Sequence, residues 1–243
     1  MKTASVHAKA LLPEIIKSDF PILDICIRGK PLVYLDNAAT TQKPKRVIEA
    51  TTNYYETQNA NIRRGLHYLS EFSSSLYDET RKKTQKFINA QSSNEIIFTK
   101  GCTEAINLVA NSYGRINFKH GDEVLVSEME HHSNIVPWQM ICEQTGTKLT
   151  PIHITDDGEI DIEDFKNKLS EKTRLVALTH ISNALGTINP VHELIELTRK
   201  TDAVVLIDGA QAVRHIPVDV QELDADFYAF SAHKMYGPTG VGV

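Results

Sequence analysis

A lysine and an aspartate each follow an apolar stretch that is typical of a buried strand. Lys234 lies in the segment 231–238, just behind one such stretch, and Asp208 ends another at 204–208. Pyridoxal phosphate (PLP) needs two such groups from a protein, an amine for a Schiff base and an anion for its ring nitrogen. The two residues therefore indicate a PLP site. The alternatives are a solvated loop lysine and an aspartate that pairs with a structural partner such as a helix N-terminus.

Two further segments could hold the phosphate of such a cofactor. The sequence after Gly101 opens a predicted helix, and free N–H groups at a helix start, together with the Thr103 hydroxyl, suit an anion. A helix that is simply capped by Thr103 is the alternative. Ser231 and His233 flank Lys234 closely enough to bind the phosphate while the lysine reaches the aldehyde.

Polar side chains in three other segments could contact the ring or the substrate. His131 could lie flat on a cofactor ring and pass protons. Its neighbour His132 does not make a metal site with it, because no Cys or His partner lies at suitable spacing. Asn183 could donate to a ring oxygen or to a substrate carboxylate, and Gln211 could bond the phenolic oxygen. Taken alone, a loop histidine and an ordinary turn remain open alternatives.

Short apolar runs alternate with amphipathic stretches along most of the chain. This pattern predicts an α/β fold, a mostly parallel central sheet flanked by helices. Ligands in such sheets bind beyond the carboxyl ends of the strands, where the residues above collect. The predicted strands are 32–35, 96–99, 123–127, 148–153, 174–180, 203–207 and 227–231. The predicted helices are 45–58, 70–88, 103–116, 134–143, 162–168 and 192–199.

The chain is expected to divide into an N-terminal arm with one short helix, residues 1–35, and a large domain, residues 36–243. Residues 240–243 read as the start of a further strand, so the large domain is expected to be truncated at its C-terminal end.

Composition excludes several other classes of protein. The 243 residues carry a formal charge of −5, which gives no basic surface for nucleic acid. No apolar run is long enough for a membrane span, and the N-terminus lacks the apolar core of a signal peptide. Three cysteines are few and odd in number, so no disulfide framework is implied. We expect a cytoplasmic protein.

Six motifs together resemble the N-terminal part of a Suf-type cysteine desulfurase, in the class V aminotransferase group of fold-type-I PLP enzymes. The resemblance runs from about Phe20 to Val243. The motifs are Leu35-Asp36-Asn37-Ala38-Ala39, Arg64-Gly65-Leu66-His67, Gly101-Cys102-Thr103-Glu104, Met129-Glu130-His131-His132, Asp208-Gly209-Ala210-Gln211-Ala212 and Ser231-Ala232-His233-Lys234.

The resemblance implies a role for each matching position. Lys234 resembles the lysine that binds PLP covalently, and His131 the imidazole stacked on the ring. Asp208 resembles the partner of the ring nitrogen. The remaining implied contacts are Gln211 with the phenolic oxygen, Thr103, Ser231, His233 and the Cys102 backbone with the phosphate, and Asn183 with the substrate carboxylate.

The implied activity converts L-cysteine to L-alanine and transfers the sulfur to an enzyme persulfide for iron–sulfur cluster assembly. The implied partners are a second copy of the chain and a sulfur-acceptor protein of the Suf system. In the family, the sulfur-accepting cysteine, the main carboxylate-binding arginine and a small C-terminal domain follow the region matched here. Relatives often carry histidine at the position of Arg63. A selenocysteine lyase, another class V enzyme and a non-catalytic truncated remnant are the alternatives.

Overall fold

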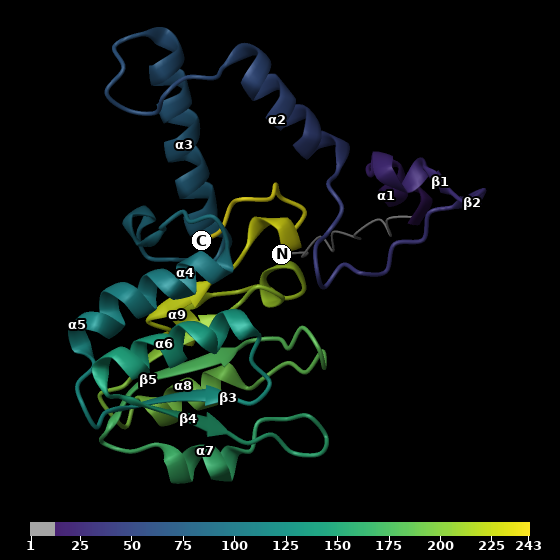
Figure 1. Ribbon diagram of the computed structural model, residues 1–243. Coiled ribbons are helices and arrows are strands. Elements are labelled where there is room, and N and C mark those ends of the chain that lie inside the picture. The colour runs from purple at the N-terminus through teal and green to yellow at the C-terminus, as the bar shows by residue number, and fades with distance from the viewer. Residues whose placement is uncertain (1–12) are drawn as a thin grey trace, which may run out of the picture.

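The computed structural model describes residues 13–243, and its centre is a parallel sheet of five strands in the order β4-β3-β5-β6-β7 (Figure 1). The strands are β3 Glu123–Ser127, β4 Lys148–Ile152, β5 Thr173–Thr179, β6 Val204–Asp208 and β7 Phe227–Ala229. The predicted α/β fold, with a parallel sheet flanked by helices, is confirmed.

Both faces of the sheet are buried. Successive side chains of a strand point to opposite faces, so each strand contributes to two buried clusters. Val124 and Val126 of β3 belong to one buried cluster, which contains Trp138, and Leu125 between them belongs to a second. The helices on the first face are α4 Cys102–Val109, α5 Arg115–Asn117 and α6 Val136–Thr145, and those on the second are α7 Ile162–Lys168 and α8 Val191–Thr198. A short helix, α9 Val220–Leu223, precedes β7.

The N-terminal part lies beside this layered body. Helix α1 Pro13–Ser18 and the two-residue strands β1 Cys26–Ile27 and β2 Lys30–Pro31 form a small arm, whereas α2 Lys45–Thr57 and α3 Tyr68–Phe87 extend away from the sheet (Figure 1). Residues 1–12 of the predicted arm lie outside the described residues. The division of the chain at residue 35 stays a prediction. Within residues 13–243, no helix is long and apolar enough to cross a membrane.

The strand order creates a crevice at one point of the sheet. From β3 the chain moves outward to β4 and then returns to the other side of β3 as β5. The loops that leave β3 and β5 therefore run in opposite directions, which opens space between them at the carboxyl ends of the strands. This is where the fold allows a ligand to bind.

Two predicted strands are wrong as stated. Residues 32–35 are not a strand, and a small antiparallel hairpin forms just before them instead. Residues 96–99 contribute only one antiparallel bridge, from Thr99 to Gly242, and Gly242 also bridges to Ser231. A single residue pair on each side is too short for a strand, so the strand predicted to start in 240–243 is present only as these bridges.

The approach of the chain end to the start of α4 depends on glycine. A Cβ atom at Gly242 would lie 2.4 Å from the Cα atom of Gly101. The predicted helix 103–116 begins one residue early, at Cys102, and a π-helical turn over Ala110–Gly114 divides it into α4 and α5.

Leu178 of β5 tests the packing of the central strand, because its side chain is fully buried. The substitution Leu178→Ala should lower the free energy of unfolding by roughly 2–5 kcal/mol, since it leaves a cavity that the surrounding strands cannot close. Ile116→Ala is the matched control, at a side chain that is 79% exposed. Urea denaturation measures both. An equal loss in the two variants would contradict the assigned core.

Candidate active site

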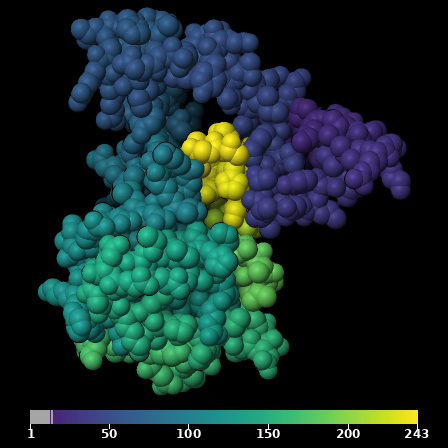
Figure 2. All heavy atoms as spheres, viewed as in Figure 1, coloured from purple at the N-terminus to yellow at the C-terminus, as the bar shows by residue number. Residues whose placement is uncertain are grey.

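A cavity of about 470 Å³ lies at the carboxyl ends of the strands, and every predicted site residue except Gln211 lines it. The turn that carries Lys234 belongs to the C-terminal segment, which lies between the N-terminal segment and the sheet body (Figure 2). A second cavity of about 340 Å³, between β7 and residues 96–99, contains none of these residues. The lining residues of the first are Asp36, Ala38, Ala39, Cys102, Thr103, His131, Ser133, Asn183, Asp208, Ala210, Ser231, His233 and Lys234.

Asp208 is a buried carboxylate at the end of β6, with 4% of its surface exposed. Its Oδ1 atom accepts hydrogen bonds from the Ala210 N–H at 2.9 Å and from the Cys102 thiol at 3.4 Å. Among the described residues, no hydrogen bond reaches its Oδ2 atom. Burial and the adjacent Asp208 charge raise the pKa of the Cys102 thiol, which therefore stays protonated as the donor. One carboxylate oxygen is thus held and the other is left for the cavity.

The start of α4 forms the opposite wall of the cavity. The Cys102 N–H donates to Ser231 Oγ at 2.7 Å, which ties the first residue of the helix to the segment after β7. Thr103, the next residue, is exposed and lines the same cavity. A helix start with N–H groups and hydroxyls directed at one space suits an anion such as a phosphate.

The Lys234 turn is held by residues far away in the sequence. The His233 carbonyl accepts hydrogen bonds from the Thr40 and Thr41 hydroxyls at 3.1 and 3.0 Å, and from Lys43 Nζ at 3.0 Å. His233 Nδ1 in turn lies 3.1 Å from Thr40 Oγ1, and because that hydroxyl already donates its proton, the imidazole is the donor. These hydrogen bonds hold the backbone next to Lys234, whose side chain lines the cavity.

His131 follows β3, and its ring is oriented by its own loop. Both the backbone N–H and the hydroxyl of Ser133 contact His131 Nδ1, at 3.1 and 2.7 Å. Because a backbone N–H can only donate, Nδ1 is the acceptor and the neutral ring carries its proton on Nε2. Burial and then the Lys234 charge lower the pKa of His131, against the opposing effect of Asp208. A neutral imidazole is therefore favoured in the cavity.

Gln211 lies behind the cavity wall rather than on it. Its side chain is buried, its Nε2 donates to the Ala38 carbonyl at 2.7 Å, and its Oε1 accepts from Arg214 Nη2 at 3.2 Å. Arg214 also donates to the Asn37 carbonyl at 2.7 Å. Gln211 and Arg214 thus hold the loop that lines the cavity through Ala38.

Sequence reasoning gave no role to several of these supporting residues. Thr40, Thr41, Lys43 and Arg214 were missed because their partners lie more than 170 residues away. The only available signal was the Asp36–Ala39 motif, whose neighbours they are. The pair His180 and Tyr228 was also missed. His180 Nδ1 lies 2.9 Å from the Tyr228 hydroxyl, and the Tyr228 ring packs against Gly209, the residue after Asp208.

The donor set fits PLP on three counts. The cavity combines one lysine amine, a buried carboxylate with an oxygen to spare, and a helix start with hydroxyl groups. An amine binds an aldehyde, a carboxylate binds a protonated ring nitrogen, and the helix start binds a phosphate. The cavity volume lies in the range that holds small cofactors. None of the described residues form a cluster of His, Cys, Asp or Glu that could hold a metal ion.

Comparison with known proteins agrees with this geometry. Residues 33–243 match the family described as aminotransferase class-V. The chain belongs to that family. Class V aminotransferases and cysteine desulfurases depend on PLP in general. The resemblance seen in the sequence is therefore confirmed at the level of the family.

One protein similar to this chain is a probable cysteine desulfurase of Halalkalibacterium halodurans. The two sequences are 54% identical over a region that covers 94% of the chain and 56% of the relative. A cysteine desulfurase of Dickeya dadantii is 53% identical over 94% of the chain and 55% of the relative. The apo structure of a cysteine desulfurase from Thermococcus onnurineus superposes with a TM-score of 0.88 at 41% identity, covering 97% of the chain and 57% of its own. The class V chain thus spans about half the length of the curated relatives it matches.

The buried His180 makes the stability of this class V chain depend on pH. Burial lowers the pKa of His180 to about 4, so the unfolded chain binds a proton between pH 6.5 and 4 that the folded chain does not. Above pH 6.5, His180 is neutral in both states and takes nothing from the stability of the folded state. As the pH falls below 6.5, proton binding to the unfolded chain lowers that stability. Between pH 7 and pH 5, the wild type should lose about 2 kcal/mol more unfolding free energy than His180→Gln. Urea titrations of both proteins measure this difference, and parallel pH curves would contradict a buried neutral His180.

Proposed function

We propose that this chain forms the cofactor-binding part of a PLP-dependent cysteine desulfurase. The reaction converts L-cysteine and a protein thiol to L-alanine and a persulfide, so the substrate C–S bond breaks and the acceptor S–S bond forms. One observation carries the proposal: Lys234, Asp208 and His131 come from three different strand ends and line one cavity. The relatives named cysteine desulfurase support the choice of substrate.

The cofactor would be held at both ends of the cavity. Bound PLP supplies an electron sink for the negative charge that develops at the substrate Cα atom. Asp208 would hold the ring nitrogen in its protonated form through the free carboxylate oxygen. Ser231 and Thr103 would bind the phosphate at the start of α4, where the Cys102 N–H donates to Ser231 Oγ and holds that hydroxyl in place, with His233 beside them.

Two side chains of the chain itself can move protons. Lys234 Nζ would bind the aldehyde carbon and, once displaced by substrate, would remove the proton from Cα. His131 Nε2 would hold or release a proton on the substrate side, because its Nδ1 atom is occupied by Ser133. Asn183, which lines the cavity from the loop after β5, would bind the substrate carboxylate.

The sulfur acceptor is none of the three cysteines Cys26, Cys102 and Cys142. Cys102 and Cys142 are buried free thiols, and burial raises the pKa of Cys142 to about 11. A thiolate is the nucleophile in sulfur transfer, so a buried protonated thiol is a poor acceptor. Cys26 is exposed but lies in the arm and does not line the cavity.

We further propose that two copies of the chain pair. Large apolar side chains after β2 and around the start of α3 are exposed: Leu66 at 98%, Leu35 at 88%, and Val33 and Tyr68 at 74% each. Apolar surface of this kind is usually covered by a partner. The Suf-type acceptor, the link to iron–sulfur cluster assembly and the cytoplasmic location remain predictions from the resemblance.

Lys234→Ala tests the proposed Schiff base directly. The wild-type chain, incubated with PLP and reduced with borohydride, should gain one pyridoxyl group on Lys234, located by peptide mass spectrometry. Lys234→Ala should gain none, because no other amine lines the described cavity. Lys148→Ala is the control, since Lys148 begins β4 at the end of the sheet away from the cavity and its side chain is 67% exposed. A pyridoxyl group elsewhere in the wild type, with none on Lys234, would overturn the proposed function.

Asp208→Asn tests the charge at the ring nitrogen. We expect desulfuration of L-cysteine, measured as alanine formed with an added small thiol as the sulfur acceptor, to fall by on the order of 10²-fold. The neutral amide cannot stabilise a protonated ring nitrogen as a carboxylate does. Asp226→Asn, at the far end of β7, should leave the rate within twofold or so. Equal rates for Asp208→Asn and the wild type would remove Asp208 from the mechanism.

A further inference from the structure

Glu130 is a buried carboxyl group that directly precedes His131. Only 7% of its surface is exposed. Its Oε1 atom accepts hydrogen bonds from Ser127 Oγ at 2.5 Å and from the Thr179 N–H at 2.8 Å, and its Oε2 accepts from Asn134 Nδ2 at 2.7 Å. All three partners can donate, which is the environment that an acceptor-only carboxylate requires.

These partners lie on both sides of the crevice in the sheet. Ser127 is the last residue of β3, and Thr179 is the last residue of β5. The loops after these two strands carry His131 and Asn183, which both line the cavity. Glu130 is therefore a direct link between the two loops at the point where the strand order makes them diverge.

The link continues into helix α6. Asn134 Oδ1 accepts from Trp138 Nε1 at 3.0 Å, and both of these side chains are fully buried. A hydrogen-bonded row thus runs from Trp138 through Asn134 and Glu130 to the Thr179 backbone. The turn between Glu130 and Asn134, which contains His131, is held at both of its ends.

A carboxylate is an expensive group to bury at this position. Burial and, to a smaller extent, the nearby Asp208 charge raise the pKa of Glu130 to about 8, although the three hydrogen bonds act to lower it. The two carboxyl oxygens serve all three contacts, which the single oxygen of an amide cannot do.

We propose that Glu130 is a positioning residue of the candidate site, whose carboxylate holds the His131 turn against the end of β5. It does not line the PLP cavity itself. It acts through His131 and Asn183, whose loops it joins. The effect on cofactor binding rests on the proposed function, whereas the effect on the two loops does not.

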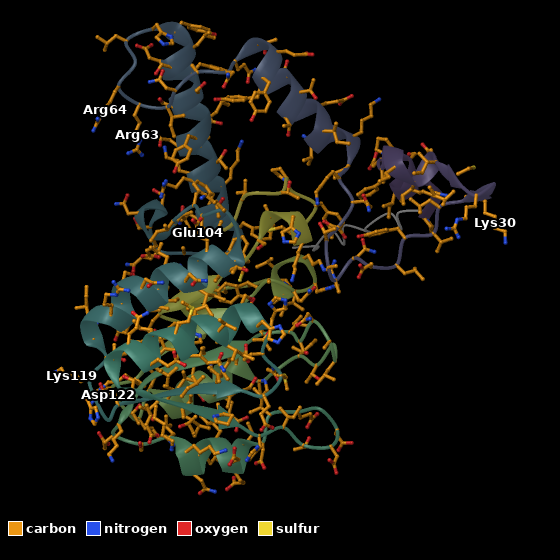
Figure 3. All side chains as sticks on the ribbon, in the orientation of Figure 1. Lys30, Arg63, Arg64, Glu104, Lys119 and Asp122 are labelled. Atoms are coloured by element: carbon orange, nitrogen blue, oxygen red, sulfur yellow. The ribbon has the colours of Figure 1, made fainter. Side chains whose placement is uncertain are left out.

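Glu130→Gln is the first test. The new amide places a donor against Asn134 Nδ2, which is also a donor, so one contact of the row is lost. Hydrogen exchange of the cofactor-free chain should speed up by about tenfold or more in residues 128–134 and 179–183. Asp122→Asn is the matched control. Asp122 is also buried, accepts from the Lys119 N–H at 2.8 Å and Arg174 Nε at 3.1 Å, and lies at the opposite end of β3 (Figure 3).

The double variant Glu130→Gln, Asn134→Asp is the rescue. An aspartate at position 134 can accept hydrogen bonds from both the new amide and Trp138 Nε1. The double variant therefore restores every contact of the row, with the carboxylate now at position 134 instead of position 130. Exchange in the two loops should return to within about threefold of the wild type. A return shows that the hydrogen-bonded row, rather than general damage to the fold, sets the loop positions.

The bound cofactor gives a second, independent measurement. Glu130→Gln should change the circular dichroism of bound PLP and weaken PLP binding about tenfold, while Asp122→Asn changes neither, even if both lower the unfolding midpoint equally. A merely structural role would affect both variants alike. If the wild type binds no PLP, the proposed function fails, and the exchange experiment still decides the role of Glu130.

Two results would overturn the inference. One is unchanged exchange in residues 128–134 and 179–183 of Glu130→Gln. The other is the same acceleration in Asp122→Asn. If Glu130→Gln does not fold, Ser127→Ala replaces it, because it removes one donor and leaves the carboxylate with two. Faster exchange in the same two loops then supports the inference, and no change contradicts it.

Discussion

The parallel register of strands β3, β5, β6 and β7 is the constraint on which the site depends. Parallel strands end at the same edge of a sheet, so the residues that follow them in sequence meet in space although up to a hundred residues separate them. His131, Asn183, Asp208 and Lys234 each follow a different strand. The two buried clusters stabilise that register, because a slip of one residue would exchange the side chains that pack in one cluster for those that pack in the other.

Buried charge is the second theme of the molecule. Asp208 ends β6 and Glu130 follows β3, so the two groups lie on either side of β5, and both accept hydrogen bonds from uncharged donors rather than from cations. In Asp208 one oxygen remains available to the cavity, whereas in Glu130 both oxygens are used. The first arrangement suits contact with a ligand, and the second suits holding the loops that make such contact.

The sequence predicted the sheet and its helices because apolar runs and amphipathic stretches alternate clearly along residues 123–229. It predicted eight of the thirteen cavity-lining residues because each follows an apolar run, whereas Asp36, Ala38, Ala39, Ser133 and Ala210 were given no site role. The strand predicted at residues 96–99 is wrong. The apolar pattern of this segment resembles a strand, but the segment pairs with another strand-like segment only at Thr99. Sequence reasoning also missed Thr40, Lys43 and Arg214, because their contacts with main-chain carbonyls carry no pattern that a single sequence displays.

A crystal structure of this chain grown with PLP would test the central claim most directly. The account predicts continuous electron density from Lys234 Nζ to the cofactor, with the ring nitrogen within hydrogen-bond distance of the Asp208 carboxylate and the phosphate at the start of α4. Density for PLP on another lysine, or a ring nitrogen that faces away from Asp208, would contradict it.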